Sequence, residues 1–150
     1  TIFITFIALS MTKVVAQNEE DLQKISVFRE YVKSKNYDAA YTPWMELRNR
    51  NPRFNKAIFI YGERILKSKI KKTTAAEQVA YINDMIKLWE ERATFFPSIT
   101  PPGTYMAKAC QLKYDNRKAL GLTKKELYTD VGEAYAADDK TCTNTKSLYT

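Results

Sequence analysis

The chain has 150 residues, 45% of them hydrophobic and 27% charged, which is long enough for a buried core and ordinary for a soluble globular protein. It holds only four glycines, few for a protein built from sheets and turns, and its lysine, glutamate and alanine content favours helices. The formal charge of +7 is a moderate excess that does not identify a partner. We therefore expect an all-α fold.

The first 16 residues resemble the latter part of a secretory signal peptide. Ile2–Leu9 is an almost unbroken apolar run, shorter than the roughly 20 residues that a membrane-spanning helix needs. Val14 and Ala16 fit the small-residue rule before a cleavage point, which predicts cleavage before Gln17. A buried N-terminal helix is the alternative interpretation.

The signal-like start predicts where the mature protein resides. No cysteine directly follows Ala16, which argues against a lipid anchor. We expect an exported mature chain without a transmembrane span, either periplasmic or associated with the outer envelope. The chain lacks an initiating methionine and a basic segment before Ile2, so we expect it to be a fragment at this end.

Two helices are expected between Asn18 and Pro52. Asn18 is a suitable N-cap for the first, which would run to about Lys35. The second follows a turn at Asn36 and ends at Pro52, with a kink expected at Pro43. The apolar positions of each helix recur every three or four residues, as one buried face requires: Leu22, Ile25, Phe28, Tyr31 and Val32, and then Ala40, Trp44 and Leu47.

The third and fourth helices are expected from Asn55 to about Lys69 and from Thr74 to about Phe95. Thr74 and Glu77 form a capping-box pattern, and Pro97 ends the fourth helix. Their expected inner faces are Ile58, Tyr61, Ile65 and Leu66, and Val79, Ile82, Met85, Ile86, Trp89 and Ala93.

The end of the third helix carries the densest basic run of the chain. Lysines are favoured at a helix C-terminus by the helix dipole, so a solvated helix end is the simpler interpretation. A patch for an anionic partner is the alternative. The run consists of Arg64, Lys67, Lys69, Lys71 and Lys72.

The remainder predicts two more helices and the start of a seventh. The fifth is expected from about Thr104 to Ala119, after the connector Thr100–Gly103, and the sixth from a second capping box at Thr123 to about Asp138. Asn144 is a suitable cap for a seventh helix that the chain does not complete, so we expect the natural protein to continue beyond Thr150. The expected inner faces are Met106, Ala107, Cys110 and Tyr114, and Leu127, Val131, Ala134 and Tyr135.

Positions about 34 residues apart match the first helix of a repeated helical hairpin: Lys24, Val27, Phe28 and Tyr31, and then Ile58, Tyr61, Gly62 and Ile65. Together with Ala40, Trp44, Leu47 and Pro52, this pattern resembles the tetratricopeptide repeat (TPR) superfamily. The resemblance implies an all-α, right-handed superhelical array of antiparallel helix hairpins, a TPR-like α-solenoid, over residues 17–150. It would contain about six helices and the start of a seventh.

The sequence offers little for catalysis. It contains no histidine, which removes the commonest general base and metal ligand. Its glycines form neither G-x-G-x-x-G nor a P-loop. Glu90 and Glu91 point about 100° apart on a helix and do not converge on one substrate. We therefore assign no catalytic, cofactor-binding or metal-binding residue.

The two cysteines and the two tryptophans have structural interpretations. Cys142 is expected near the start of the fifth helix and Cys110 about 9 Å along it, beyond the reach of about 7 Å between disulfide Cα atoms. Two separate thiols are therefore expected. Trp44 and Trp89 lie on apolar helix faces, which predicts core positions.

The TPR resemblance implies a scaffold that binds a protein or peptide on its concave face. Our hypothesis is a non-enzymatic adaptor of the bacterial cell envelope, with no nucleic-acid partner. The alternatives are a glycan- or polymer-binding helical envelope protein and a helical accessory domain of a longer enzyme. The resemblance assigns partner contacts to Arg29, Lys33, Lys56, Phe59, Glu63 and Lys67.

The signal-like segment gives a first testable prediction. When the complete reading frame is expressed in a bacterial host, the mature protein should begin at Gln17, which intact-mass measurement and N-terminal sequencing can establish. Substitution of Ala16 with a bulky residue should block this cleavage. A chain from the same host that retains residues 1–16 would contradict the prediction and favour the buried-helix alternative.

Overall fold

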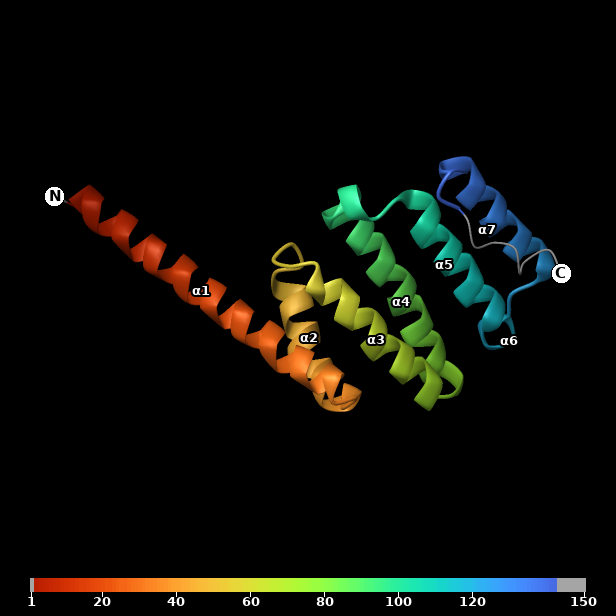
Figure 1. Cartoon of the computed structure of the whole chain (residues 1–150), viewed down its shortest axis with the longest axis horizontal. Coiled ribbons are helices and arrows are strands. Elements are labelled where there is room, and N and C mark those ends of the chain that lie inside the picture. Colours follow the sequence, from red (N-terminus) through yellow and green to blue (C-terminus); the bar gives the residue numbers. More distant parts are fainter. Residues whose placement is uncertain (1, 143–150) are drawn as a thin grey trace. The chain divides into compact units, whose positions relative to one another are not determined.

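The computed structural model describes residues 2–142 of the chain, and side chains for residues 17–142 apart from that of Ala75. Over this range all regular elements are helices, which confirms the all-α prediction (Figure 1). The expected helix capped by Asn144 lies outside the described residues. Within the described part of the chain, no helix combines the length and the apolar character needed to cross a membrane.

The chain divides into two compact units, Thr1–Tyr61 and Gly62–Thr150. The division falls within helix α3 (Ala57–Lys72). It differs from the boundary after residue 16 that the sequence suggests, and that boundary stays a prediction. The right-handed array of hairpins also stays a prediction.

The first unit is built on the hairpin of α1 (Ile2–Lys33) and α2 (Tyr37–Arg50), which pack against each other (Figure 1). The expectation that Asn18 caps the first helix is wrong, because α1 begins at Ile2 and passes through Asn18 without interruption. The start of α2 is as expected. Asn36 is its N-cap, and the side chain of Asn36 accepts a hydrogen bond of 3.3 Å from the backbone N–H of Ala39.

The predicted inner face of α2 is confirmed. Ala40, Trp44 and Leu47 are all fully buried. The indole Nε1 of Trp44 donates a hydrogen bond of 2.8 Å to the backbone carbonyl of Ile58, so the large side chain is buried without an unpaired donor. Trp44 is therefore a core residue, as the sequence predicts.

A buried carboxylate joins the two helices of this hairpin. Asp21 on α1 is fully buried and accepts hydrogen bonds from the guanidinium of Arg50 and, at 2.9 Å, from the side-chain amide of Asn51 at the C-cap of α2. Arg50 also donates to the exposed Glu20 at 2.7 Å. Because a buried charge is costly unless it is paired, these bonds hold the end of α2 beside α1.

The second unit contains the rest of α3, then α4 (Ala75–Phe95), the 3₁₀ helix η1 (Pro97–Ile99), α5 (Pro102–Asp115), α6 (Arg117–Leu120) and α7 (Lys124–Ala137). The expected fifth helix is therefore divided: α5 begins two residues earlier than predicted, and the separate short helix α6 ends before Gly121. Gly121 adopts the left-handed conformation with φ of 66°, which favours glycine.

The two predicted capping boxes differ in outcome. At α7 the prediction is confirmed, because the backbone N–H of Glu126 donates to the Thr123 hydroxyl at 3.3 Å and the Glu126 carboxylate accepts from the Thr123 backbone at 2.8 Å. At α4 it is wrong. Thr74 is the N-cap and has an extended backbone, but its side chain makes no capping hydrogen bond.

Small residues allow α5 and the segment at the end of α7 to approach closely. A Cβ atom on Gly103 would lie 2.4 Å from the backbone oxygen of Asp138 and 2.6 Å from the backbone nitrogen of Cys142, so only glycine fits. The shared core of α5 and α7 consists of Ala107, Cys110, Val131, Ala134 and Cys142.

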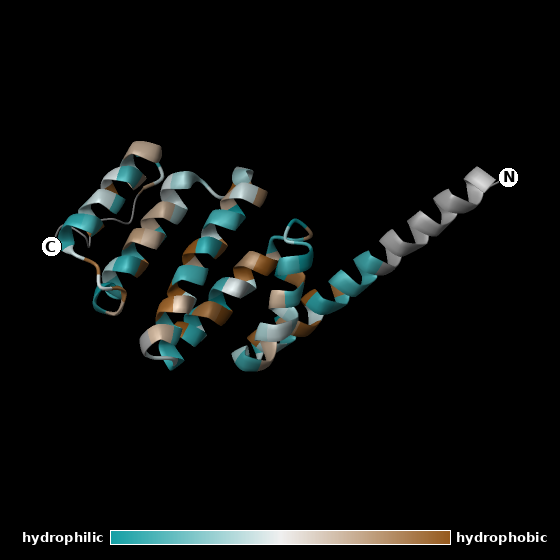
Figure 2. Ribbon diagram, turned by 180° about the vertical axis from the view of Figure 1, so that it is seen from behind, coloured by the Kyte–Doolittle hydropathy of each residue, from teal (hydrophilic) through white to brown (hydrophobic). Residues whose placement is uncertain are grey.

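Two further expectations concern the cysteines and the inner face of α7. Cys110 and Cys142 are both buried free thiols, as expected. Tyr135, which the sequence places inside, is 39% exposed. Hydrophilic and hydrophobic residues alternate along α3 and α4, as helices with one buried face require (Figure 2).

The hydrogen bonds of the buried Asp21 carboxylate give a second testable prediction. Asp21→Asn should lower the free energy of unfolding of the first unit by about 1.5–3 kcal/mol, because one carboxylate oxygen becomes an NH2 group, which cannot accept the hydrogen bond from Arg50 or Asn51 and leaves buried polar groups unpaired. Urea denaturation followed by circular dichroism measures this change. Glu20→Gln is the matched control, since Glu20 bonds the same arginine from an exposed position, and it should change stability little. Equal effects of the two substitutions would show that burial of Asp21 does not matter.

Candidate binding groove

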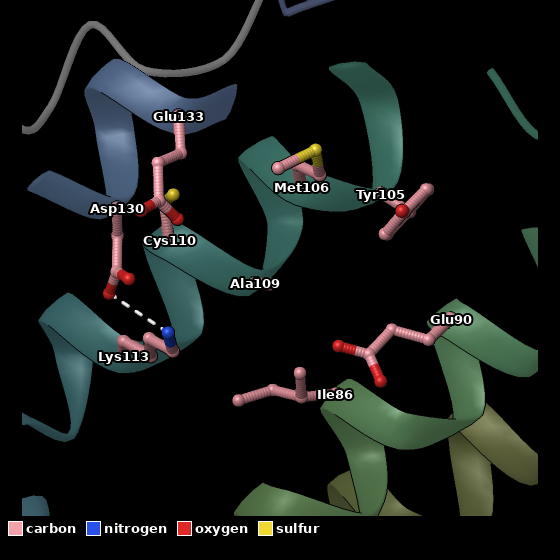
Figure 3. A pocket seen from close by; sticks show the side chains of 9 residues that line it. All are labelled: Ile86, Glu90, Tyr105, Met106, Ala109, Cys110, Lys113, Asp130 and Glu133. Carbon is pink, nitrogen blue, oxygen red and sulfur yellow. Dashed lines mark hydrogen bonds and ion pairs between the residues drawn. The ribbon is translucent and has the colours of Figure 1, made fainter. Parts of the chain in front are cut away.

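A groove of about 170 Å³ lies between helices α4, α5 and α7 of the second unit (Figure 3). Ile86 and Glu90 contribute from α4, and Asp130 and Glu133 contribute from α7. The longest side is α5, which supplies Tyr105, Met106, Ala109, Cys110 and Lys113.

The lining combines apolar and acidic side chains. Ile86, Met106 and Ala109 provide apolar surface. Lys113 forms an ion pair of 2.9 Å with Asp130, so these two charges offset each other. Glu90 and Glu133 are exposed, and their carboxylates have no hydrogen-bond or ion-pair partner among the residues that the structure describes.

The groove is therefore acidic on a chain with an excess of positive charge. One lysine faces three carboxylates, an excess of two negative charges, whereas the whole chain carries +7. Glu90 extends from α4 toward the space in front of α5, and Glu133 extends from α7 on the other side (Figure 3). The unpaired charges thus come from opposite walls.

The thiol at this site is unsuited to nucleophilic chemistry. Cys110 is only 4% exposed, and burial, with a further contribution from the negative charge of Asp130, raises the pKa of its thiol to about 11. Since the thiolate is the reactive form, Cys110 is protonated and unreactive at neutral pH.

A network centred on Glu63 connects the two walls of the groove that α4 and α5 form. The Glu63 carboxylate on α3 accepts hydrogen bonds from Nε1 of Trp89 on α4 at 3.2 Å and from Nζ of Lys67 at 3.0 Å. It also pairs at 3.4 Å with Nζ of Lys108 on α5, which lies 5.7 Å from the centre of the Trp89 ring. The network fixes α4 relative to α5 through directional polar contacts.

The same contacts set the protonation of Glu63. Burial alone would raise the pKa of this carboxyl, but hydrogen bonds from Lys67 and Trp89 and the positive charge of Lys108 outweigh burial. The pKa is therefore held below its ordinary value of 4.5. Glu63 is ionised at neutral pH and attracts both lysines.

The partner contacts implied by the TPR resemblance are divided between the two units. Arg29, Lys33 and Lys56 are exposed in the first unit, and Lys33 is paired with Glu30 at 2.8 Å. Whether they contact a partner stays a prediction. Phe59 is only 1% exposed, so the expectation that it faces a partner is corrected: it is a core residue.

The remaining two of these residues lie in the second unit. Lys67 is 66% exposed and pairs with Glu63. The Glu63 side chain is only 15% exposed, because it lies within the network with Trp89 and Lys108. Its carboxylate connects α3 with α4 and α5, and a contact between Glu63 and a partner stays a prediction.

Sequence reasoning missed the groove, although part of its pattern is visible in the sequence. Tyr105, Ala109 and Lys113 recur at four-residue spacing on α5, so they share one face. Asp130 and Glu133 are three residues apart on α7. Such spacing shows which residues share a face, but it does not show which helix that face meets.

Comparisons with protein-family models, with curated proteins and with solved structures found no match to the chain. Among the described residues, no three histidine, cysteine, aspartate or glutamate side chains are grouped so that they could hold a metal ion.

The Glu63 network gives a third prediction. Glu63→Gln should destabilise the second unit by about 1 kcal/mol at pH 7, because the ionised carboxylate and its charge-assisted bonds are lost. Because the pKa of Glu63 is lower in the folded chain, wild type has this advantage above the unfolded pKa of about 4.5 and loses it as pH falls through the folded value.

Urea denaturation between pH 3 and pH 7 tests this prediction. The difference between wild type and Glu63→Gln should be constant from pH 6 to 7 and should shrink below about pH 4.5. Lys67→Gln is the control, since it removes only the exposed partner and should have a small effect. A difference independent of pH over this range would show that the charge of Glu63 is not what stabilises the unit.

Proposed function

We propose that this chain is a non-enzymatic helical adaptor that binds a partner protein or peptide, and that the groove between α4, α5 and α7 is the binding surface of its second unit. The observation that carries the proposal is the combination in one groove of apolar side chains with two carboxylates, Glu90 and Glu133, that have no partner among the described residues. Binding sites typically join an apolar lining to a few polar groups that fix orientation.

The states of the Cys110 thiol and of Asp130 favour a binding function over a catalytic one. Nucleophilic catalysis needs an activated group, and the thiol of Cys110 has a raised pKa. The chain has no histidine that could activate it. Asp130 is engaged with Lys113. The groove therefore presents charge and apolar surface without an activated nucleophile.

The proposal also includes the setting of the protein. The signal-like residues 1–16 support export to the periplasm or outer envelope. The hairpin of α1 with α2 and the packing of α7 on α5 suit an array of stacked hairpins, the TPR-like arrangement that we propose for the chain.

A capture experiment tests this function. The immobilised chain, incubated with a cell-envelope extract, should retain a protein partner, and Ala109→Trp should reduce retention about tenfold by filling the groove with an indole. Ala136→Trp, at an exposed position of α7, is the matched control and should retain the partner. Circular dichroism establishes that both variants are folded.

Two outcomes contradict the proposal. Capture of envelope polysaccharide with no protein would favour the glycan-binding alternative. Equal retention by wild type and Ala109→Trp would place the partner surface outside the groove.

A further inference from the structure

We infer that the groove between α4, α5 and α7 receives the side chain of a lysine or arginine residue from a partner segment. This inference deepens the proposed function and rests on it. It follows from the charge of the walls, the apolar surface between them and the engagement of the groove's own lysine.

The charge of the groove selects a cation. Glu90 and Glu133 face the groove from α4 and α7, and neither has a partner among the described residues. Each of these carboxylates can accept a charge-assisted hydrogen bond from a cationic group in the groove. An acidic ligand would be repelled, and a purely apolar one would remove water from carboxylates without replacing its hydrogen bonds.

Lys113, the lysine that lines the groove, is already paired with another carboxylate. The ammonium of Lys113 is directed to Asp130 at 2.9 Å, as the dashed line in Figure 3 shows. This pair closes one end of the lining and leaves Glu90 and Glu133 for a ligand. These two carboxylates are therefore suited to a second cation supplied from outside the chain.

The apolar lining suits the stem of a basic side chain. Lysine and arginine bury their methylene groups along apolar surface while the charged head stays near polar groups. Ile86, Met106 and Ala109 provide such surface, and the ring of Tyr105 lies at the same groove. A small inorganic cation would gain nothing from these residues, whereas an alkyl ammonium or alkyl guanidinium gains from both features.

The cation is recognised by side chains close to the groove and not by the overall charge of the chain. At physiological salt, interactions of exposed charges fade over about 8 Å, so the basic residues elsewhere affect approach more than binding in the groove. The chain as a whole carries +7, so a free cation is not concentrated by the overall field. We therefore expect weak binding of a single amino acid and tighter binding within a longer partner segment.

A titration followed by methyl NMR tests the inference on the intact chain. The probes are Nα-acetyl-lysine amide and Nα-acetyl-arginine amide, and the reporter is the methyl group of Met106, assigned with Met106→Leu. Both probes should shift this signal saturably. Nα,Nε-diacetyl-lysine amide, which keeps the stem but lacks the charge, should bind at least about tenfold more weakly.

Variants identify the groups responsible. The double variant Glu90→Gln and Glu133→Gln should weaken binding of the lysine probe by about tenfold or more. Glu77→Gln, an exposed residue in the first turn of α4 that does not line the groove, is the matched control and should leave binding unchanged. The heteronuclear spectrum of each variant establishes that the fold is kept.

The outcomes separate this inference from the proposed function. Absence of a saturable Met106 shift with both cationic probes overturns the inference, and so does equal affinity of wild type and the double variant. If wild type and the double variant bind a captured partner equally, the adaptor function stands and the inference is overturned. If the cationic probes bind as expected but no protein partner is captured, the cation site stands and the adaptor function fails.

Discussion

The carboxylate of Glu63 is the contact on which the arrangement of the second unit depends. It meets the indole of Trp89 on α4 and the ammonium of Lys108 on α5, so one side chain of α3 positions both helices. Each bond contributes only about 1 kcal/mol to net stability, but directional bonds define the distance and register of the helices that they join. The two helices form facing walls of the groove, with Glu90 on one wall and Met106 on the other.

The third wall depends on a different kind of contact. Gly103, Ala107 and Ala134 are small, so α7 and the segment after it can approach α5 closely enough to bury Cys110 and Cys142. This closeness brings Asp130 and Glu133 to the groove. The first unit is held by other contacts. The indole of Trp44 lies in its core, and the buried carboxylate of Asp21 on α1 accepts a hydrogen bond from Asn51 at the end of α2. In the second unit, close helix packing thus accompanies an open acidic groove.

Local signals in the sequence predicted the helices and many of their inner faces, and they failed where tertiary contacts decide. The face of Trp44 and the capping box at Thr123 depend on spacing along one helix, which the sequence contains in full. The cap expected at Asn18 failed because helical residues precede it, and the box at Thr74 failed because spacing does not fix the direction of a hydroxyl. The groove could not be predicted, because no spacing within α4, α5 or α7 shows that these faces of the three helices meet.

Hydrogen exchange of the whole chain with and without a captured partner tests the central claim most directly. If the groove is the binding surface, amide exchange should slow mainly in α5 and α7, with a smaller effect in the part of α4 around Glu90. The helices α1 and α2 should then exchange at the same rate in both samples. Slower exchange confined to α1 and α2 would contradict the account, since the partner would then bind the first unit and the acidic groove would have no part in recognition.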